Sequence, residues 1–153
     1  MQAKRLQPSE ISPELYNAVV KVDELTYQST LGKALIELVK VRVSQINGCA
    51  FCLNMHAKAA RKAGNSEQKL YLLSAWKEAT IFTSRERAAL GWTEVLSRIA
   101  ETGAEDEYYT PLLAEFDEKE IVDLTLLIGL INLWNRLAIG MKYTLPNSTT
   151  DLT

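Results

Sequence analysis

The chain lacks the concentration of positive charge that nucleic-acid-binding proteins carry. Its 17 Lys and Arg residues are outnumbered by 19 Asp and Glu residues, which leaves a formal net charge of −2. The closest approach to a basic patch consists of five residues mixed with neutral and apolar ones: Lys4, Arg5, Lys58, Arg61 and Lys62. These are too few for a phosphate-binding surface, so we expect no nucleic-acid partner.

The chain also has few long hydrophobic runs. Its first ten residues, MQAKRLQPSE, contain no apolar core, so no secretory signal is expected there. The most apolar run, residues 121–141, includes Asp123 and Arg136, which would be costly inside a bilayer. We therefore expect a buried central helix, no membrane association and a cytoplasmic location. In that compartment thiols stay reduced unless their pairing is transient or functional.

Cysteine and histidine are scarce, and all of them lie together. The chain has two cysteines and one histidine among 153 residues. Cys49, Cys52 and His56 fall within eight consecutive positions. Chance, a metal site and a redox site are the three explanations for this crowding, and the helices expected around these residues help to choose between them.

Residues that cap helices divide the chain into about six helical segments. The expected helices begin at Pro13, cover about 31–46, 49–63 and 66–79, and begin again at the capping boxes Thr83/Glu86 and Asp117/Glu120, with Pro111 marking a break or short turn between the last two. No window alternates apolar and polar residues with a period of two, so no sheet is expected. The sequence predicts one all-α domain of about six helices, followed by a polar tail from Pro146 that frays.

The three reactive side chains share one face of the third expected helix. At 100° per residue, Cys49, Cys52 and His56 lie within about 60° of each other, and His56 follows Cys52 by one turn. Cys49 would open the helix, where unpaired N–H groups and the positive end of the dipole favour a thiolate. A C-x-x-C pair at a helix start permits a reversible disulfide. The imidazole could serve as a base for Cys52 or stabilise its thiolate.

An imidazole base needs an orienting partner, and Glu37 is the best candidate. It lies in the segment ALIELVKV, where a carboxylate without a partner would be costly. A chain that doubles back at Asn47-Gly48 could bring Glu37 over the third helix. Glu37, His56 and Cys52 would then stand in series as carboxylate, imidazole and nucleophile.

The same residues could instead bind zinc. The spacing C-x-x-C-x-x-x-H supplies three zinc ligands, and Glu37 could be a fourth. Structural zinc sites usually take their second ligand pair from a separate loop, however, and this chain has no further Cys or His. A single helix is also an awkward scaffold for three ligands of a closed tetrahedron. We therefore expect no bound metal, and ordinary core packing remains the alternative for each residue taken alone.

The spacing Glu37, eleven residues, then Cys49-x-x-Cys52-x-x-x-His56 resembles a known signature. It is similar to that of the alkylhydroperoxidase D-like (AhpD-like) branch of the carboxymuconolactone decarboxylase superfamily. Two further stretches, residues 74–96 and 131–140, resemble the second half of the family. The likeness covers roughly residues 12–143, so residues 1–153 are expected to form a single AhpD-like domain.

This resemblance implies an all-helical homo-oligomer, often a trimer or hexamer, with thiol-dependent peroxidase activity. Carried over residue by residue, it makes Cys52 the peroxidatic cysteine and Cys49 the resolving one, with His56 and Glu37 as the proton relay. The resemblance implies no cofactor beyond an external dithiol reductant, such as a lipoyl group, a thioredoxin-like protein or a small thiol. The chemistry would pass from thiolate to sulfenic acid to disulfide.

The sequence departs from the family pattern in the residue before the second cysteine. Well-studied peroxidase members have a second histidine there, and this chain has Phe51. Decarboxylase members generally lack the cysteine pair, which argues against lactone decarboxylation. The competing functions are a disulfide reductase or redox-partner module, and a non-enzymatic helical oligomer with structural zinc. Asn132, Asn135 and Arg136 are expected to form a buried network that joins helices or subunits.

Overall fold

All regular secondary structure is helical over residues 5–146, the part of the protein that its computed structural model describes. In this range there are nine α-helices, one 3-10 helix and no strand: α1 (Pro8–Ile11), α2 (Pro13–Thr26), α3 (Lys33–Asn47), α4 (Ala50–Lys62), α5 (Glu67–Tyr71), η1 (Leu73–Ala75), α6 (Ser84–Ser97), α7 (Ile99–Thr102), α8 (Asp106–Glu115) and α9 (Glu118–Gly140). The all-α class is confirmed. The expected fraying beyond Pro146 concerns residues 147–153, which lie outside the described range.

Several predicted helix boundaries are confirmed, because their capping residues act locally. Both expected capping boxes form: Thr83 with Glu86 opens α6, and Asp117 with Glu120 opens α9. In the second box the Glu120 amide donates to Asp117 Oδ1 at 2.8 Å. α3 ends at Asn47 and is capped by Gly48, whose φ of 67° lies in the left-handed region that glycine adopts without strain.

The predicted helix over residues 66–79 is wrong in its second half. α5 ends at Tyr71, and the chain continues as the short 3-10 helix η1. The Arg87 guanidinium on α6 donates to the carbonyls of Trp76, Lys77 and Ala79 at 2.9–3.1 Å. Since a side chain from a distant helix takes these carbonyls, the segment satisfies its backbone without continuing as an α-helix.

The expected break at Pro111 is also wrong, because Pro111 lies inside α8. Proline removes one backbone donor, which leaves the carbonyl of Glu107 without its helical partner. Glu107 is solvent-exposed, so water can satisfy that carbonyl. Leu112, the next residue, is fully buried, and its packing in the core holds α8 in place despite the proline. The short helices α1 and α7 were likewise not expected.

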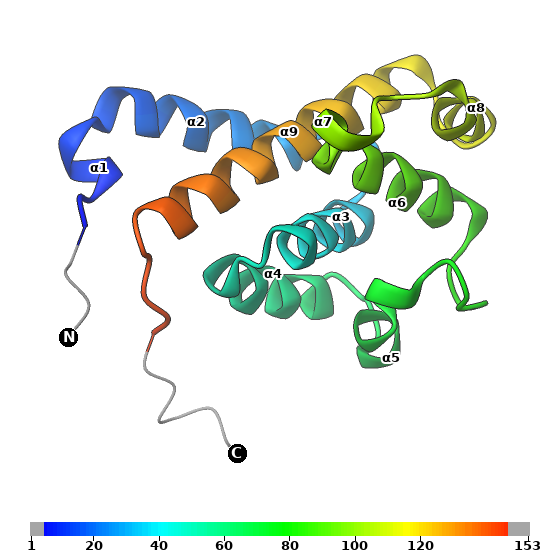
Figure 1. Cartoon of the computed structure of the whole chain (residues 1–153), viewed down its shortest axis with the longest axis horizontal. Coiled ribbons are helices and arrows are strands. Elements are labelled where there is room, and N and C mark those ends of the chain that lie inside the picture. Colours follow the sequence, from blue (N-terminus) through cyan, green and yellow to red (C-terminus); the bar gives the residue numbers. More distant parts are fainter. Residues whose placement is uncertain (1–4, 147–153) are drawn as a thin grey trace.

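α3 is the central helix of the fold. In Figure 1 it runs through the middle of the molecule, with α9 and α4 on opposite sides. Ten consecutive residues of α3, 35–44, are buried. One face of α3 packs with α6 and α9 in the larger core cluster, and the other packs with α4 and η1 in a second cluster. The buried run includes three charged side chains, Glu37, Lys40 and Arg42, which therefore need partners inside the protein.

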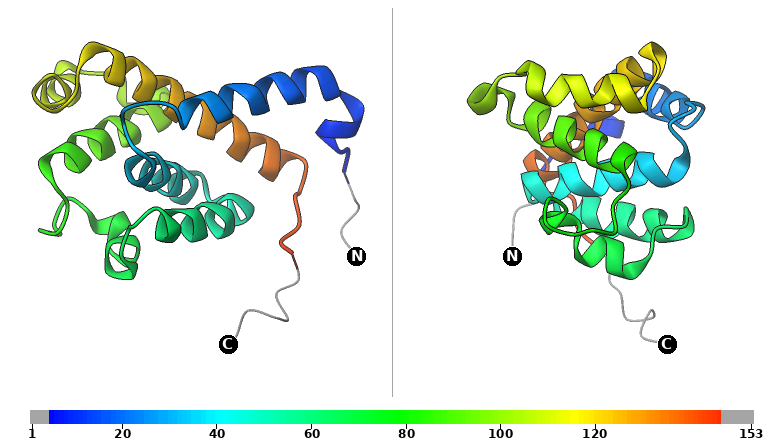
Figure 2. Two further views of the ribbon diagram at one scale, coloured as in Figure 1. Left: turned by 180° about the vertical axis from the view of Figure 1, so that it is seen from behind. Right: turned by 90° about the vertical axis from the view of Figure 1, so that its right-hand side faces the viewer.

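α9 was expected to be the buried central helix, and it is buried on one side only. Its outward face exposes Val122, Leu126, Leu133 and Ile139. By length and composition α9 is apolar enough to cross a membrane, as no other helix among residues 5–146 is, but half of its most apolar window is buried inside the protein. Figures 1 and 2 show α2 lying along α9 at the edge of the molecule, and no residue of α2 is buried.

Candidate active site

The turn between α3 and α4 brings Glu37 against His56. α3 ends at Asn47, Gly48 reverses the chain in the left-handed conformation, and α4 then runs back along α3. Glu37 Oε2 lies 2.9 Å from His56 Nδ1, although the two residues are 19 positions apart. Both side chains are buried. The structure thus makes the contact that the doubling back at Asn47-Gly48 was expected to allow.

This contact fixes which nitrogen of His56 can act as a base. An ionised carboxylate only accepts hydrogen bonds, so Nδ1 must carry a proton and donate it to Glu37. In the neutral imidazole the lone pair is then on Nε2. An imidazole held in this tautomer can take a proton at Nε2 while the carboxylate stabilises the resulting cation.

Glu37 is held in the ionised form. Burial acts to raise the pKa of its carboxyl group, but hydrogen bonds from His56 and Tyr27, together with the charges of His56 and Lys40, outweigh burial and lower the pKa below its ordinary value. A carboxylate with a lowered pKa is a poor proton carrier near neutral pH. Glu37 is therefore better suited to orienting His56 than to relaying protons.

Three residues of this site were missed from the sequence: Tyr27, Lys40 and Asp23. The Tyr27 hydroxyl donates to Glu37 Oε1. Lys40 Nζ donates to the Tyr27 oxygen at 2.9 Å and to Asp23 Oδ1 at 2.8 Å. Lys40 carried a usable signal, because it follows Glu37 by three positions in the same apolar helix and should have raised the same concern about buried charge.

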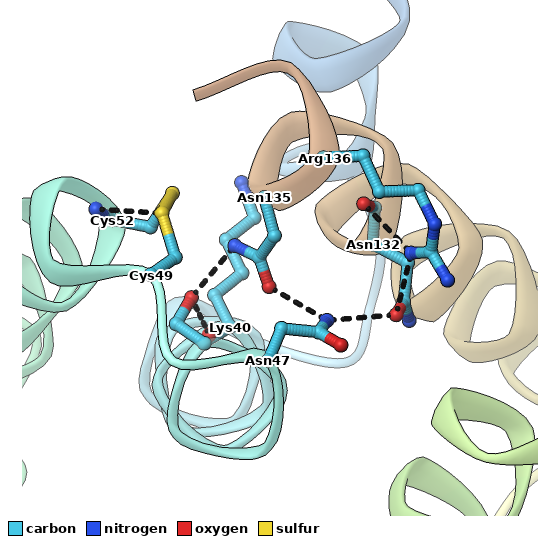
Figure 3. Close-up of a disulfide and its surroundings, with 8 residues drawn as sticks. Lys40, Asn47, Cys49, Cys52, Asn132, Asn135 and Arg136 are labelled. Carbon is cyan, nitrogen blue, oxygen red and sulfur yellow. Dashed lines mark hydrogen bonds between the residues drawn. A yellow bond between two sulfur atoms is a disulfide. The ribbon is translucent and has the colours of Figure 1, made fainter. Parts of the chain in front are cut away.

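The two cysteines lie at the start of α4 as a disulfide. Cys49 is the N-cap, and its sulfur accepts the Cys52 amide at 3.3 Å. Their Cα atoms are 5.3 Å apart and their sulfurs are bonded, as Figure 3 shows. Cys49 and Cys52 are only 1% and 2% exposed, and they pack against Ala138 of α9. The structure therefore represents the oxidised state of the C-x-x-C pair.

A cavity of about 460 Å³ opens beside the disulfide. Cys49 lines it, whereas Cys52 is not among the described residues that do so. Phe51 and Tyr143 also line the cavity, with their rings edge to face at 5.2 Å. Phe51, which replaces the family's second relay histidine, thus contributes an apolar wall and no proton-carrying group.

The expected buried network is present at Asn132 and Asn135 and joins α9 to α3, whereas Arg136 is exposed and donates to Asn132 on its own helix. Asn47 Nδ2 donates to the side-chain oxygens of Asn132 and Asn135, each at 2.9 Å. Asn135 in turn donates to Ser44 Oγ at 3.1 Å. Figure 3 shows this network beside the disulfide. Since Asn47 comes two residues before Cys49, the network fixes the end of α3 from which the cysteine turn departs.

The residues described here offer no arrangement of three or more His, Cys, Asp or Glu side chains that could hold a metal ion. The zinc interpretation is tested directly by metal analysis of protein purified without chelator.

The amino-acid sequence matches the model of the carboxymuconolactone decarboxylase family over residues 13–95. It is 41% identical over 139 residues to the uncharacterized protein YdfG of Bacillus subtilis, which covers 91% of this chain and 95% of YdfG. It is 35% identical over 115 residues to the uncharacterized protein YnjA of Escherichia coli, which covers 74% of this chain and 62% of YnjA.

Solved structures share the same fold. A protein of unknown function from Agrobacterium tumefaciens, proposed to be the antioxidant defence protein AhpD, superimposes with a TM-score of 0.90 and 44% identity, covering 94% of this chain and 99% of that one. The debrominase Bmp8 superimposes with a TM-score of 0.79 at 17% identity, covering 88% of this chain and 73% of that one, and so shows the fold alone. By sequence and by fold, the chain belongs to the carboxymuconolactone decarboxylase family, in its AhpD-like branch.

Proposed function

We propose that this protein is a thiol-dependent peroxidase that reduces hydroperoxides through Cys49 and Cys52. The observation that carries the proposal is the buried contact, 2.9 Å long, between Glu37 of α3 and His56 of α4, the helix that opens with the C-x-x-C disulfide. Support also comes from the AhpD-like family and from the antioxidant role proposed for the Agrobacterium tumefaciens relative.

In the oxidative half of the reaction, Cys52 is the peroxidatic residue. Its thiolate attacks the distal peroxide oxygen, the O–O bond breaks, and Cys52 becomes a sulfenic acid. The departing alkoxide takes a proton from the His56 imidazolium and leaves as an alcohol. The Cys49 thiol then attacks the Cys52 sulfur, so that the disulfide forms and the sulfenic oxygen leaves as water.

In the reductive half, an external dithiol supplies two electrons and two protons. Cys49 lines the open cavity, so the incoming thiolate would attack the Cys49 sulfur and form a mixed disulfide there. Cys52 then departs as a thiolate on the same helix as His56, whose imidazolium can stabilise it. The second thiol of the reductant releases Cys49. A lipoyl group, a thioredoxin-like protein or a small dithiol would satisfy this chemistry, and no other cofactor is proposed.

We also propose that the protein works as a cytoplasmic homo-oligomer. No residue of α2 is buried, and Leu15, Val22 and Leu25 on this helix are exposed. A helix with an apolar face and no buried residue gains stability when a second copy covers it. Light scattering on the purified protein checks this, and a monomer at micromolar concentration would contradict it.

The cysteine variants test the peroxidase directly. Cys52→Ser should consume no peroxide, because it lacks the attacking sulfur. Cys49→Ser should react once and stop as a Cys52 sulfenic acid, which a dimedone adduct detects by mass spectrometry. Wild-type turnover by both variants, with a dithiol reductant present, would refute the proposed mechanism.

A second candidate function is supported by one observation. Cys49 is the N-cap of α4, accepts a backbone amide and lines an open cavity, which is typical of the attacking thiol in a protein disulfide reductase. Fast exchange between reduced protein and a protein disulfide, together with negligible peroxide turnover, would favour this function over the peroxidase.

A further inference from the structure

Lys40 is buried more completely than any other charged residue among those described, with 0% of its surface exposed. An ammonium group in the interior is costly unless acceptors surround it. Its Nζ donates to Asp23 Oδ1 at 2.8 Å and to the Tyr27 oxygen at 2.9 Å, and it also lies 4.3 Å from the centre of the Tyr27 ring. Two of these three contacts involve the same residue, Tyr27.

The contacts define the direction of each hydrogen bond. An ammonium group only donates, so the Tyr27 oxygen must accept from Lys40. The single hydroxyl hydrogen of Tyr27 is then left for Glu37 Oε1, which can only accept. The other carboxylate oxygen, Oε2, accepts from His56. Lys40, Tyr27, Glu37 and His56 therefore form one chain of bonds whose polarity has no alternative.

The chain also connects three helices. Asp23 lies in the last turn of α2 and Tyr27 is its C-cap, Glu37 and Lys40 lie on α3, and His56 lies on α4. The charged and titratable groups that face Glu37 are His56 from α4, Lys40 from its own helix and Tyr27 from α2, with Asp23 behind them. Burial and the neighbouring Glu37 carboxylate raise the pKa of Tyr27, so the hydroxyl stays protonated and remains a donor.

We propose that Tyr27 and Lys40 are positioning residues of the active site, which hold Glu37 as the carboxylate that orients His56 toward its role as the base for Cys52. Asp23 compensates the charge of Lys40 and keeps its Nζ directed at Tyr27. This inference rests on the proposed thiol chemistry, but it concerns the reactivity of Cys52 itself and not the identity of the substrate.

The test uses the reduced Cys49→Ser protein, in which Cys52 is the single thiol, and follows its alkylation by iodoacetamide as a function of pH. Adding Tyr27→Phe removes one donor to Glu37 and retains the ring. Loss of a hydrogen bond to a charged group should slow alkylation near neutral pH about tenfold. The acid limb of the profile, which is the pH range over which the alkylation rate falls on acidification, should also move to higher pH. The reason is that Glu37 loses a hydrogen-bond donor and is protonated more easily.

Two further variants complete the design. Tyr109→Phe is the matched control, since Tyr109 is an exposed residue whose ring contacts Trp92, away from the site; its rate and acid limb should not change. Asp23→Asn with Lys40→Met removes both charges together and avoids a stranded ion. It should move the acid limb in the same direction as Tyr27→Phe, because the positive charge near Glu37 is lost.

The outcomes separate this inference from the peroxidase proposal. If Tyr27→Phe shows wild-type helicity and an unchanged acid limb, the positioning role is wrong. If Tyr27→Phe does not fold, the combination Tyr27→Phe with Lys40→Met, which leaves no ammonium without its acceptor, decides by the same criterion. If Tyr27→Phe shifts the acid limb in the Cys49→Ser background and the wild-type protein consumes no peroxide, the positioning role is supported and the peroxidase is refuted. An unshifted limb together with peroxide turnover by the wild-type protein would do the reverse.

Discussion

Two clusters of hydrogen-bonded polar and charged residues extend from the buried part of α3, and they differ in the last group that each one reaches. The first joins Lys40, Tyr27 and Glu37 to His56. The second joins Arg42 to Glu94, with Arg42 Nη2 at 2.8 Å from Glu94 Oε1. Glu94 also accepts from Trp76 Nε1 at 2.8 Å and from Lys77 at 3.1 Å.

The two carboxylates have the same electrostatic signature. For each of them burial raises the pKa and hydrogen bonds outweigh it, so the pKa of both Glu37 and Glu94 is lowered. Glu94, however, accepts from a guanidinium, an indole N–H and an ammonium group, all of which serve only as donors. Its cluster ends at the exposed ammonium of Lys77. Glu37 instead contacts the imidazole of His56, a group that can serve as a general acid or base. A carboxylate in the interior with a lowered pKa therefore indicates a candidate site when its hydrogen bonds lead to a group that can act as an acid or a base.

The largest expected effect comes from replacing His56, the residue that makes the two clusters different. His56→Gln keeps a hydrogen-bonding side chain of similar length but cannot act as an acid or base. We expect peroxide turnover to fall by about 100-fold, the lower end of the range for general acid–base catalysis. Stopped-flow measurement of peroxide consumption checks this, and a loss of less than threefold would remove His56 from the mechanism.

A smaller effect is expected at the carboxylates, where the clusters can be compared directly. Glu37→Gln should lower turnover about tenfold, since losing the partner that orients a functional histidine typically costs that much. Glu94→Gln is the matched control: it should leave turnover near wild type and destabilise the fold instead, by about 1–3 kcal/mol. Equal losses of turnover in the two variants, at equal folded fraction, would show that the clusters do not differ in function.

The smallest expected effect is shared by both clusters and concerns acid stability. Because the pKa values of Glu37 and Glu94 are lowered in the folded protein, the stability that they contribute is present above the ordinary carboxyl pKa of 4.5 and is lost as the pH falls through the folded values. The melting temperature should therefore drop below about pH 4.5. Glu94→Gln should drop less steeply over that range, and identical slopes for variant and wild type would contradict the assignment.

Much of the candidate site could be predicted because its determinants are local. The helical repeat places Cys49, Cys52 and His56 on one face, and Gly48 with φ of 67° marks the turn that returns α4 along α3. Once α4 runs back along α3, the buried Glu37 carboxylate needs a partner, and the side chains of α4 lie next to it. The capping boxes at Thr83 and Asp117 fixed helix starts for the same reason, since each acts within four residues.

The parts that escaped prediction depend on contacts between distant segments. Tyr27 lies on a different helix from Glu37, and nothing in its neighbourhood marks it as a hydrogen-bond donor to a buried carboxylate. The carbonyls of Trp76, Lys77 and Ala79, in the part of the predicted helix that does not form, are bound by Arg87 of α6. Pro111 is tolerated inside α8 because Leu112 is anchored in the core. Local rules give no access to these tertiary effects.

Peroxide is expected to convert the reduced protein to the Cys49–Cys52 disulfide. The most direct measurement is mass spectrometry of the fully reduced protein before and after one equivalent of hydroperoxide, with digestion to the peptide that contains Cys49 and His56. This peptide should lose two hydrogens as the peroxide is consumed. Thiols that survive the peroxide intact, in protein that remains folded, would contradict it.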